Sequence, residues 1–563
     1  MLSQSELKPS FQVTARLENA RTGDFSVKIR FTDNAGSHRD ITASPSLLKS
    51  RRRLQSILED KGAYFSGDPD VDGAAWQELD ASLPTAPQYI IPAQPGWFGD
   101  GTEAFASTNW AIDQRDEPVE LCAAQPDPNS PSARMRNEGS LKAWQNEVAR
   151  PALQSSRMVC AISATFAGPL LKPAGMHPFG LMMYGPSKAG KSTLLVSAGS
   201  VIGFRDELSL PNFRATATAL AELPASFNDM ALLLNEFGAV RGGNADLREI
   251  LRVMSYGLAE GRGTQYSSLA CGRAAPESWR CIAIGNSEHS SDAIAAKSGE
   301  TRDEGEMVRW IDLPALSKNS PDIFDYVKQV PMGGNRADWL MRTCKRIRKA
   351  CEENHGVAFH EYIHKLTYHR RIAKVVADLQ AEFVEIVSKD SDSALVLHLA
   401  NAFAIIYVGG VLGVHTGVLP WTEEDVLKSL KRCFRAAKGQ ITTEDDLIKR
   451  GLKTLAKNVA SENIVSLKNG VPLPSNPEQA DGYRTKDGKR PLVTISVQAL
   501  YRWFPDHRVL FALVNHLAKI GALPGRPEPK IGARGIKWAE QQPKWSGGKR
   551  HRCLQIDLSK LSA

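Results

Sequence analysis

Residues 179–201 of this chain, FGLMMYGPSKAGKSTLLVSAGSV, decide its fold class. The stretch begins with an apolar run short enough for one buried strand, continues through a glycine-rich turn, and ends in an apolar periodic segment that predicts a helix. The turn has the spacing G-x-x-x-x-G-K-[ST], in which glycines let successive backbone N–H groups converge on an anion. A strand before and a helix after are the setting that this phosphate-binding loop requires. We therefore predict that the chain binds a nucleoside triphosphate.

The loop residues have distinct predicted tasks toward ATP and Mg²⁺. Lys191 is expected to reach the β- and γ-phosphates, and the Ser192 hydroxyl is expected to bind Mg²⁺. The N-terminus of the following helix adds a partial positive charge. The alternative is a glycine turn that binds no nucleotide. The predicted nucleotide-binding residues are Gly185, Pro186, Ser187, Lys188, Ala189, Gly190, Lys191, Ser192 and Thr193.

A second buried strand is predicted over residues 230–234, MALLL, and two polar residues follow it. An acidic pair at such a strand end is typical of the Walker B arrangement, whose first acid holds the Mg²⁺ shell and whose second orients the attacking water. Here Asn235 stands at the first position and Glu236 at the second. We expect Glu236 to be catalytic and Asn235 to contact Mg²⁺ through water. Because an amide lacks the full negative charge of a carboxylate, slow hydrolysis with a raised Mg²⁺ requirement is expected.

Two further residues are catalytic candidates. Residues 280–286, RCIAIGN, predict another buried strand, and its last residue, Asn286, suits a sensor of the γ-phosphate or of the water. The alternative is that Asn286 only starts a turn. Arg309, in a strand-like run, could act across a subunit boundary on a neighbour's phosphate, or simply pair with Asp312. The first possibility implies a closed ring of subunits.

Length and composition point to several domains of ordinary globular protein, with 563 residues, 42% hydrophobic and 23% charged. The eight cysteines form no C-x-x-C pair, which indicates reduced thiols in a cytoplasmic protein. Residues 393–419 contain no Asp, Glu, Lys or Arg and are long enough to span a bilayer. His398, Asn401, His415 and four glycines within them favour a buried helix and turn instead, so no membrane partner is expected.

Basic residues concentrate near the C-terminus. The net charge is +8, and from residue 526 onward there are nine Lys or Arg against three Asp or Glu. The predicted order of helix, helix, loop and β-ribbon resembles a winged helix, in which Lys549, Arg550 and Arg552 would meet DNA phosphates. The alternative is a small lid or oligomerisation domain that binds no DNA. Five basic residues on the helix predicted near residue 345 are interpreted as a solvated face: Arg342, Lys345, Arg346, Arg348 and Lys349.

One further motif suggests a different metal. His360, Glu361 and His364 form H-E-x-x-H, which is typical of zinc proteases. A catalytic zinc needs a third protein ligand, for which only generic candidates such as Glu382 and Glu385 follow. The surrounding helix is also rich in basic residues that repel a dication. We therefore assign no metal other than Mg²⁺.

Several of these stretches together resemble the bacterial family called domain of unknown function 927 (DUF927). They are residues 161–203 around the phosphate-binding loop, FRATATALAELPASFNDMALLLNEFG, WRCIAIGNSE, GEMVRWIDLPA and LANAFAIIYVGGVLGVHTGVLPW. The resemblance implies an AAA+-like P-loop ATPase of phages, plasmids or chromosomal cassettes, and some members are similar to helicases that replicate such elements. The family usually has Asp where Asn235 stands, so Asn235→Asp is expected to speed turnover and to lower the Mg²⁺ requirement.

The predicted fold is α/β, with an AAA+-like P-loop NTPase core, an N-terminal α/β domain, a helical region and a C-terminal winged-helix-like module. The expected function is an ATP-driven motor on DNA, a helicase or translocase of a mobile element that forms a homo-oligomeric ring, expected to be a hexamer. The alternative is a nucleotide-dependent switch or scaffold with slow hydrolysis, for example in anti-phage defence. The expected boundaries are 1–140 for the N-terminal domain, 141–330 for the core, 331–467 for the helical domain, 468–490 for a linker and 491–563 for the basic module.

Overall fold

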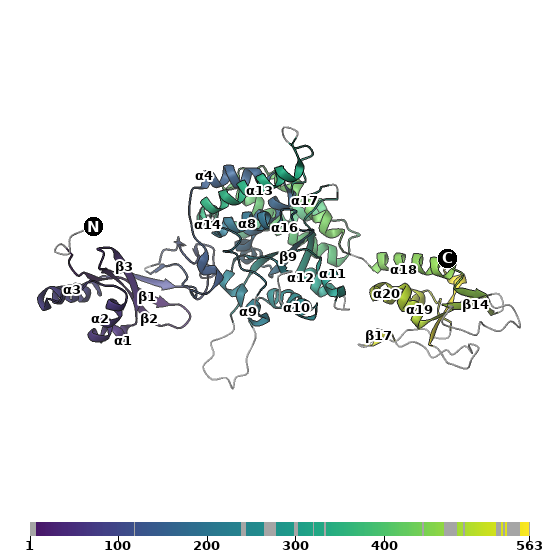
Figure 1. The fold of residues 1–563 in the computed structure, drawn as a ribbon, viewed down its shortest axis with the longest axis horizontal. Coiled ribbons are helices and arrows are strands. Elements are labelled where there is room, and N and C mark those ends of the chain that lie inside the picture. The colour runs from purple at the N-terminus through teal and green to yellow at the C-terminus, as the bar shows by residue number, and fades with distance from the viewer. Residues whose placement is uncertain are drawn as a thin grey trace. The chain divides into compact units, whose positions relative to one another are not determined.

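The structure is a computed structural model of the chain. It describes residues 7–117, 119–214, 216–237, 244–263, 277–297, 302–318, 320–330, 334–441, 444–466, 481–487, 490–524, 531–532, 535–536 and 552–561. The chain divides into two compact units, Met1–Lys438 and Gly439–Ala563 (Figure 1). Each unit contains hydrophobic clusters of its own.

The first unit begins with a five-stranded sheet of order β3-β2-β1-β4-β8. The alternating apolar pattern puts Phe11, Val13 and Ile29 on the face that packs against Leu54 and Leu58 of the following helix. Two helices follow the third strand and are separated by Lys49 and Ser50. The elements are β1 Phe11–Asn19, β2 Phe25–Thr32, β3 His38–Ala43, α1 Pro45–Leu48, α2 Arg51–Asp60, α3 Pro69–Ser82, β4 Gln88–Ile91 and β8 Glu120–Leu121.

A small three-stranded sheet follows, formed by β5 (Gly96–Trp97), β6 (Ala104–Ala106) and β7 (Ala111–Asp113). Trp97 anchors it, because the indole Nε1 donates to the carbonyl of Pro169 at 2.7 Å and the backbone N–H donates to Asp229 Oδ2 at 3.1 Å. Both partners are buried, and Asp229 directly precedes the strand Met230–Leu234 of the parallel sheet described next. The small sheet is thereby fastened to that parallel sheet.

The core of the first unit is a four-stranded parallel sheet of order β10-β11-β9-β12. The strands are buried almost throughout, which explains their continuous apolar sequences. Leu234, Gly285 and Met182 share one level in the register, so β10, β11 and β9 end at the same edge of the sheet. The strands are β9 Phe179–Tyr184, β10 Met230–Leu234, β11 Cys281–Ser287 and β12 Trp310–Pro314.

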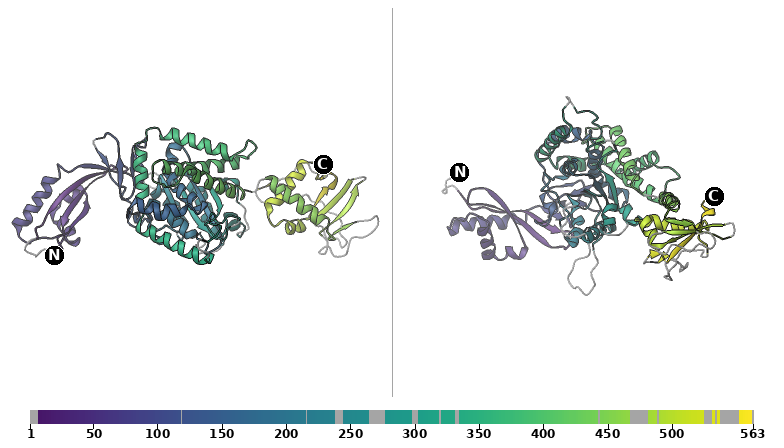
Figure 2. Two further views of the ribbon diagram at one scale, coloured as in Figure 1. Left: turned by 90° about the horizontal axis from the view of Figure 1, so that it is seen from above. Right: turned by 45° about the vertical axis from the view of Figure 1, so that its right-hand side comes forward.

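Helices surround this sheet, and Figure 2 shows those of residues 336–438, in teal and green, packed beside it. The uncharged stretch forms α16, which packs against α6, α15 and α17. Among the described residues α16 is the one helix long and apolar enough to cross a membrane, and 78% of its most apolar window is buried inside the protein. The helices are α4 Leu141–Trp144, α5 Arg150–Ala152, α6 Ser156–Ala167, α7 Leu171–Ala174, α8 Lys191–Ile202, α9 Ala217–Glu222, α10 Asn244–Glu260, α11 Ser291–Lys297, α12 Glu304–Arg309, α13 Arg336–Glu353, α14 Val357–Thr367, α15 Ile372–Val387, α16 Ala394–His415 and α17 Glu423–Lys438.

The close approach of α16 to α6 depends on Gly409, and this dependence can be tested. A Cβ atom at Gly409 would lie 2.5 Å from the carbonyl oxygen of Ser163, so Gly409→Ala is expected to destabilise the first unit by about 1–3 kcal/mol. Gly257 in α10 is the matched control, because no atom lies within 4 Å of the position of its Cβ. Gly257→Ala is expected to stabilise by roughly 0.5–1 kcal/mol. Urea unfolding followed by fluorescence measures both changes, and equal shifts of the same sign would contradict this account.

Within the described part of the second unit, a four-stranded sheet of order β13-β14-β15-β18 accompanies the helices α18, α19 and α20 and a two-stranded sheet, β16-β17. Its core joins Leu455 of α18 to Leu513 of α20, so α18 belongs here and not to the helical region that we expected to end at residue 467. The expected linker over 468–490 is also partly wrong, because β14 lies within it and pairs with β15. The elements are α18 Glu444–Val459, β13 Ile464–Ser466, β14 Gly482–Asp487, β15 Arg490–Ser496, α19 Val497–Trp503, α20 His507–Lys519, β16 Ile531–Gly532, β17 Gly535–Ile536 and β18 Cys553–Asp557.

Candidate nucleotide-binding site

The glycine-rich loop joins β9 to the N-terminus of α8, as the motif predicted. Gly190, directly before the helix, has a φ of +101°, which favours glycine. A Cβ at Gly190 would also lie 2.9 Å from the side chain of Ile323. Both the backbone angle and the packing therefore require glycine there, and the first helical residue, Lys191, is presented at the helix N-terminus.

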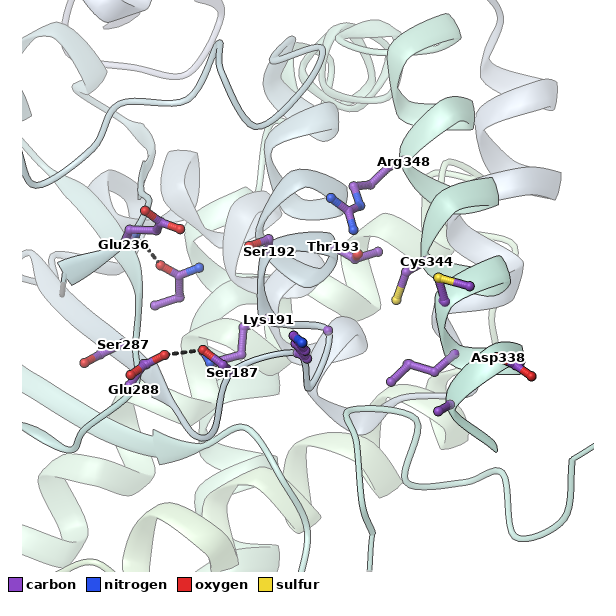
Figure 3. A pocket seen from close by; sticks show the side chains of 16 residues that line it. Ser187, Lys191, Ser192, Thr193, Glu236, Ser287, Glu288, Asp338, Cys344 and Arg348 are labelled. Carbon is purple, nitrogen blue, oxygen red and sulfur yellow. Dashed lines mark hydrogen bonds between the residues drawn. The ribbon is translucent and has the colours of Figure 1, made fainter. Parts of the chain in front are cut away.

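A cavity of about 890 Å³ opens beside this loop. The loop and the start of α8 form one wall, the ends of β10 and β11 form a second, and α13 forms a third (Figure 3). The lining residues are Ser187, Lys188, Gly190, Lys191, Ser192, Thr193, Glu236, Asn286, Ser287, Glu288, Ala337, Asp338, Leu340, Met341, Cys344 and Arg348.

Lys191 has neutral partners within the loop. Its Nζ donates to the carbonyls of Gly185 and Pro186, each at 2.7 Å. Burial lowers the pKa of Lys191 below its usual value, although the charges of Glu288 and Glu236 act in the opposite direction. An ammonium group that bonds to carbonyls beside a helix N-terminus is well placed to bind an anion.

Glu288 is a carboxylate in this cavity that the sequence interpretation missed. The Ser187 hydroxyl of the loop donates to its Oε1, and Figure 3 shows the two side chains facing each other. This hydrogen bond, followed by the charge of Lys191, holds the pKa of Glu288 below its usual value. Glu288 lies two residues after Asn286 at the same strand end, which is the signal that could have identified it.

A chain of hydrogen bonds links the strand ends. The backbone N–H of Glu236 donates to Asn286 Oδ1 at 2.5 Å, and Asn286 Nδ2 donates to Asn235 Oδ1 at 3.0 Å. Asn286 is therefore part of β11 and bridges to the next strand, so the alternative that it only starts a turn is wrong. Asn235 Nδ2 in turn donates to Glu207 Oε1 at 3.2 Å.

Asn235 is not among the residues that line the cavity. Its side chain is 7% exposed, and both ends of its amide are engaged, by Asn286 and by Glu207. The predicted contact of Asn235 with Mg²⁺ through water would have to use the second lone pair of its Oδ1, on a buried residue outside the cavity lining, and it stays a prediction. Ser192 lies in the cavity lining and keeps the hydroxyl that the motif assigns to the metal.

The backbone is strained at two positions of the site. Among the described residues, three non-glycine residues have a positive φ: Lys188 at +63°, Glu236 at +53° and Asp229 at +53°. Lys188 belongs to the loop and Glu236 to the end of β10, and both line the cavity. Residues held in this region persist where surrounding structure imposes them, often at functional sites. The strain at Glu236 places its exposed carboxylate beside the cavity.

Arg309 lies away from this cavity. It is the last residue of α12 and directly precedes β12, whose first residue, Trp310, pairs with Gly180 near the start of β9. The glycine-rich loop follows the other end of β9. Arg309 is therefore at the opposite edge of the sheet from the loop of its own chain.

The contacts of Arg309 exclude one of the two roles considered for it. Its guanidinium donates to the Gly305 carbonyl at 3.0 Å and lies over the ring of Tyr256, 5.0 Å from the centroid. Asp312 pairs instead with Arg302 at 3.2 Å. The predicted pairing of Arg309 with Asp312 is thus wrong, and an action on a neighbouring subunit stays a prediction.

The H-E-x-x-H residues lie on α14, and each of them contacts another side chain of the protein. The His360 ring packs edge-on against Trp110, with centroids 4.9 Å apart, and Glu361 pairs with Lys365 at 3.3 Å. His364 packs against Tyr368. Across the described ranges, no group of three or more His, Cys, Asp or Glu side chains is arranged to hold a metal ion.

Arg348 and Arg552, two of the basic residues singled out in the sequence, lie in different surroundings. Arg348, interpreted as part of a solvated face, lines the cavity from α13 and pairs with Glu207 at 3.5 Å. Lys549 and Arg550 lie outside the described residues, whereas Arg552 is exposed directly before β18. The DNA contacts predicted for these three residues stay a prediction.

The residues present fit a Mg²⁺-nucleotide. Lys191 and the N-terminus of α8 suit phosphates, and the Ser192 hydroxyl suits a hard cation. Leu340 and the largely exposed Met341 give the α13 wall an apolar surface on which a flat base can lie. The volume of the cavity is also within the usual range for small-molecule sites.

One family model matches part of this chain. Residues 3–274 match the model of the family described as "Domain of unknown function (DUF927)", the family that the sequence resembles. The later stretches that we included in the resemblance lie outside the matched segment. Among curated proteins, none matches this sequence.

Twelve chains of solved structures match this one. One of them is named "SCCmec type IV Cch - active helicase", with a TM-score of 0.58 and 16% sequence identity. The alignment covers 98% of this chain and 94% of that chain. At this identity the likeness shows a shared fold, a mixed α/β architecture with a helical region, along nearly the whole length of both proteins.

Proposed function

We propose that this protein is an ATP-hydrolysing, AAA+-like motor that acts on DNA, a helicase or translocase of a mobile genetic element. The observation that carries the proposal is the convergence of Lys191, Ser192, Glu236 and Asn286 on one cavity. In this proposal Lys191 binds the phosphates, Ser192 holds Mg²⁺, Glu236 orients the attacking water and Asn286 senses the γ-phosphate.

The Mg²⁺ ion would supply charge stabilisation to the transferring phosphoryl group. The chain's own residues position the reaction. The Asn286 amide accepts from the backbone N–H of Glu236, which fixes the end of β10 and so the place of the Glu236 carboxylate. Lys191 would exchange its two carbonyl partners for phosphate oxygens.

DNA as the partner is supported by the solved neighbour that is named a helicase and by the basic C-terminal region. The decisive experiment is ATPase activity with and without single-stranded and duplex DNA. We expect DNA to stimulate hydrolysis several-fold in the wild-type protein. ATP hydrolysis that DNA leaves unchanged would argue against a DNA motor.

A second candidate is a nucleotide-dependent switch or scaffold with slow hydrolysis. It is favoured by Asn235, an amide at the position where the resemblance to the family implies an Asp. In this case ATP binds tightly, turnover is slow, and DNA does not stimulate it. The same ATPase measurement therefore separates the two candidates.

A head-to-tail ring, proposed to be a hexamer, would let Arg309 act on the nucleotide of a neighbouring subunit. Arg309 is only partly buried on its own chain, at the opposite sheet edge from its own loop. Mass measurement in the presence of a non-hydrolysable ATP analogue tests the ring. A monomer under these conditions would contradict this arrangement.

DNA binding by the C-terminal basic residues is tested by neutralising Lys549, Arg550 and Arg552 together. We expect weaker DNA binding, and a log–log dependence of affinity on salt that flattens by roughly one unit for each phosphate that is no longer neutralised. Fluorescence anisotropy over a salt series measures both. Neutralising three exposed basic residues of the first unit, Arg370, Arg371 and Lys374, is the matched control. Equal slopes for all three proteins would assign the basic C-terminus to solvated surface.

A further inference from the structure

Glu207 is held against the candidate site by its own loop. This loop, between α8 and α9, lies alongside the end of β10: the backbone N–H of Asn235 donates to the Pro211 carbonyl at 2.9 Å, and that of Phe213 donates to the Asn235 carbonyl at 3.2 Å. The turn is closed by Asp206 and Ser209, which exchange two hydrogen bonds between backbone and side chain. Glu207 lies inside this turn, four residues before Pro211, so the turn and the paired segment after it together place Glu207 near the end of β10.

Both carboxylate oxygens of Glu207 meet residues connected with the cavity. Oε1 accepts from the Asn235 amide at 3.2 Å, and Oε2 lies 3.5 Å from the guanidinium of Arg348. Arg348 lines the cavity, and Asn235 bonds to Asn286, which also lines it. The Glu207 side chain is 31% exposed, so water can reach it.

The amide at position 235 suits this arrangement and a carboxylate would not. An Asn side chain accepts with its oxygen, here from Asn286, and donates with its nitrogen, here to Glu207. An Asp could still accept from Asn286, but it would place a second carboxylate about 3 Å from Glu207. Two carboxylates at such a separation do not both ionise readily.

We propose that Glu207 supplies to the site the negative charge that position 235 lacks, and that Asn235 is the positioning residue that holds Glu207 there. The inference rests on the proposed function, because the charge would act on the Mg²⁺ of a bound nucleotide through water. In this proposal the carboxylate is provided by the loop next to the strand end, and the Asn235 amide donates a hydrogen bond to it.

This arrangement reverses the expectation for Asn235→Asp that sequence comparison alone suggests. The new carboxylate would face Glu207 and would lose the hydrogen bond that holds it, so the change alone gives no gain in Mg²⁺ affinity. In the double variant, which combines Asn235→Asp with Glu207→Gln, the carboxylate stands at position 235 and the amide at position 207. The amide introduced at position 207 can then donate to the carboxylate introduced at position 235, just as Asn235 now donates to Glu207.

The test is a set of four proteins: wild type, Glu207→Gln, Asn235→Asp and the double variant. Binding of Mn²⁺ in the presence of a non-hydrolysable ATP analogue is measured by electron paramagnetic resonance, so that no turnover is involved. Glu207→Gln is expected to weaken metal binding by about 10–100-fold, the usual effect of losing an outer-shell partner. The double variant is expected to recover to within a few-fold of wild type. Thermal unfolding of each protein verifies that it is folded.

Glu222→Gln, which removes an exposed carboxylate at the end of α9, is the matched control and should leave metal binding unchanged. Unaltered metal affinity in Glu207→Gln would overturn the inference. The inference would also be overturned if the double variant lost as much metal affinity as the two single variants together. That result would mean that Glu207 only positions Arg348 and supplies no charge to the metal. Failure of the wild-type protein to bind the metal with the ATP analogue would overturn the proposed function instead.

Discussion

Replacing Lys191 by alanine is expected to abolish ATP binding while the fold stays intact. Charge-assisted hydrogen bonds contribute about 1.5–3 kcal/mol each, so removing the phosphate contacts of one ammonium should lower affinity by roughly 100-fold or more. Among the described residues, the hydrogen bonds of its Nζ go to two carbonyls of its own loop, so little of the fold depends on it. Titration with a fluorescent ATP analogue measures the effect.

Lys172 offers a matched control for this experiment. Its Nζ also donates to two loop carbonyls, of Gly99 at 2.6 Å and Gly101 at 2.9 Å, and burial lowers its pKa as it does that of Lys191. It is not among the residues that line the cavity. Lys172→Ala should therefore keep ATP binding. Wild-type affinity in Lys191→Ala would refute the assignment of the phosphate-binding loop.

The second large effect is expected for Glu236→Gln, which should keep ATP binding and stop turnover. The bond to Asn286 comes from the backbone N–H of residue 236, so glutamine leaves the link between the strands in place. Loss of the carboxylate removes the group that would orient the attacking water, and such a loss costs about 100–10,000-fold in rate. Any ring should then be trapped in its ATP-bound state.

For Glu236→Gln, we would measure both the affinity for ATP and the rate of hydrolysis in a single turnover. The two values separate an effect on binding from an effect on the chemical step. Glu222→Gln again serves as the control, with unchanged turnover. If hydrolysis survives Glu236→Gln at the wild-type rate, the residue that orients the water lies elsewhere in the cavity, and Glu288 is then the carboxylate to replace next.

The sequence predicted the strand, loop and helix of residues 179–202 because the information there is local. The loop motif lies between a buried strand and a helix, and the parallel strands around it are short continuous apolar runs. Polar residues directly after such runs must meet at one edge of the sheet, which is why Glu236 and Asn286 line the same cavity. The fold of the parallel core followed from the same patterns.

The remaining site residues depend on tertiary packing that no local pattern encodes. Arg348 faces the cavity because α13 packs against α8, whereas its sequence shows only an amphipathic helix with a basic face. Glu207 comes from a loop whose pairing with the end of β10 carries no signature in composition. Arg309 was placed within a strand, but α12 extends to this residue and leaves it at the far edge of the sheet.

The boundary between the two units was missed for a related reason. Helices α17 and α18 are both amphipathic and follow each other closely, so their sequences suggest one helical region. Only the partners of their apolar faces separate them, since α17 packs on α6 and α16, and α18 packs on α20. Amphipathic patterns predict that a face is buried, and they do not predict against which element.

The left-handed backbone of Glu236 has an evolutionary consequence. A side chain with a Cβ atom is held there at a cost of about 1–3 kcal/mol, which glycine at the same position would avoid. Selection for a stable fold alone would therefore drive this position toward glycine or asparagine. Replacement by glycine would therefore remove a cost in stability and the carboxylate together, so stability and the proposed chemistry place opposite demands on this position.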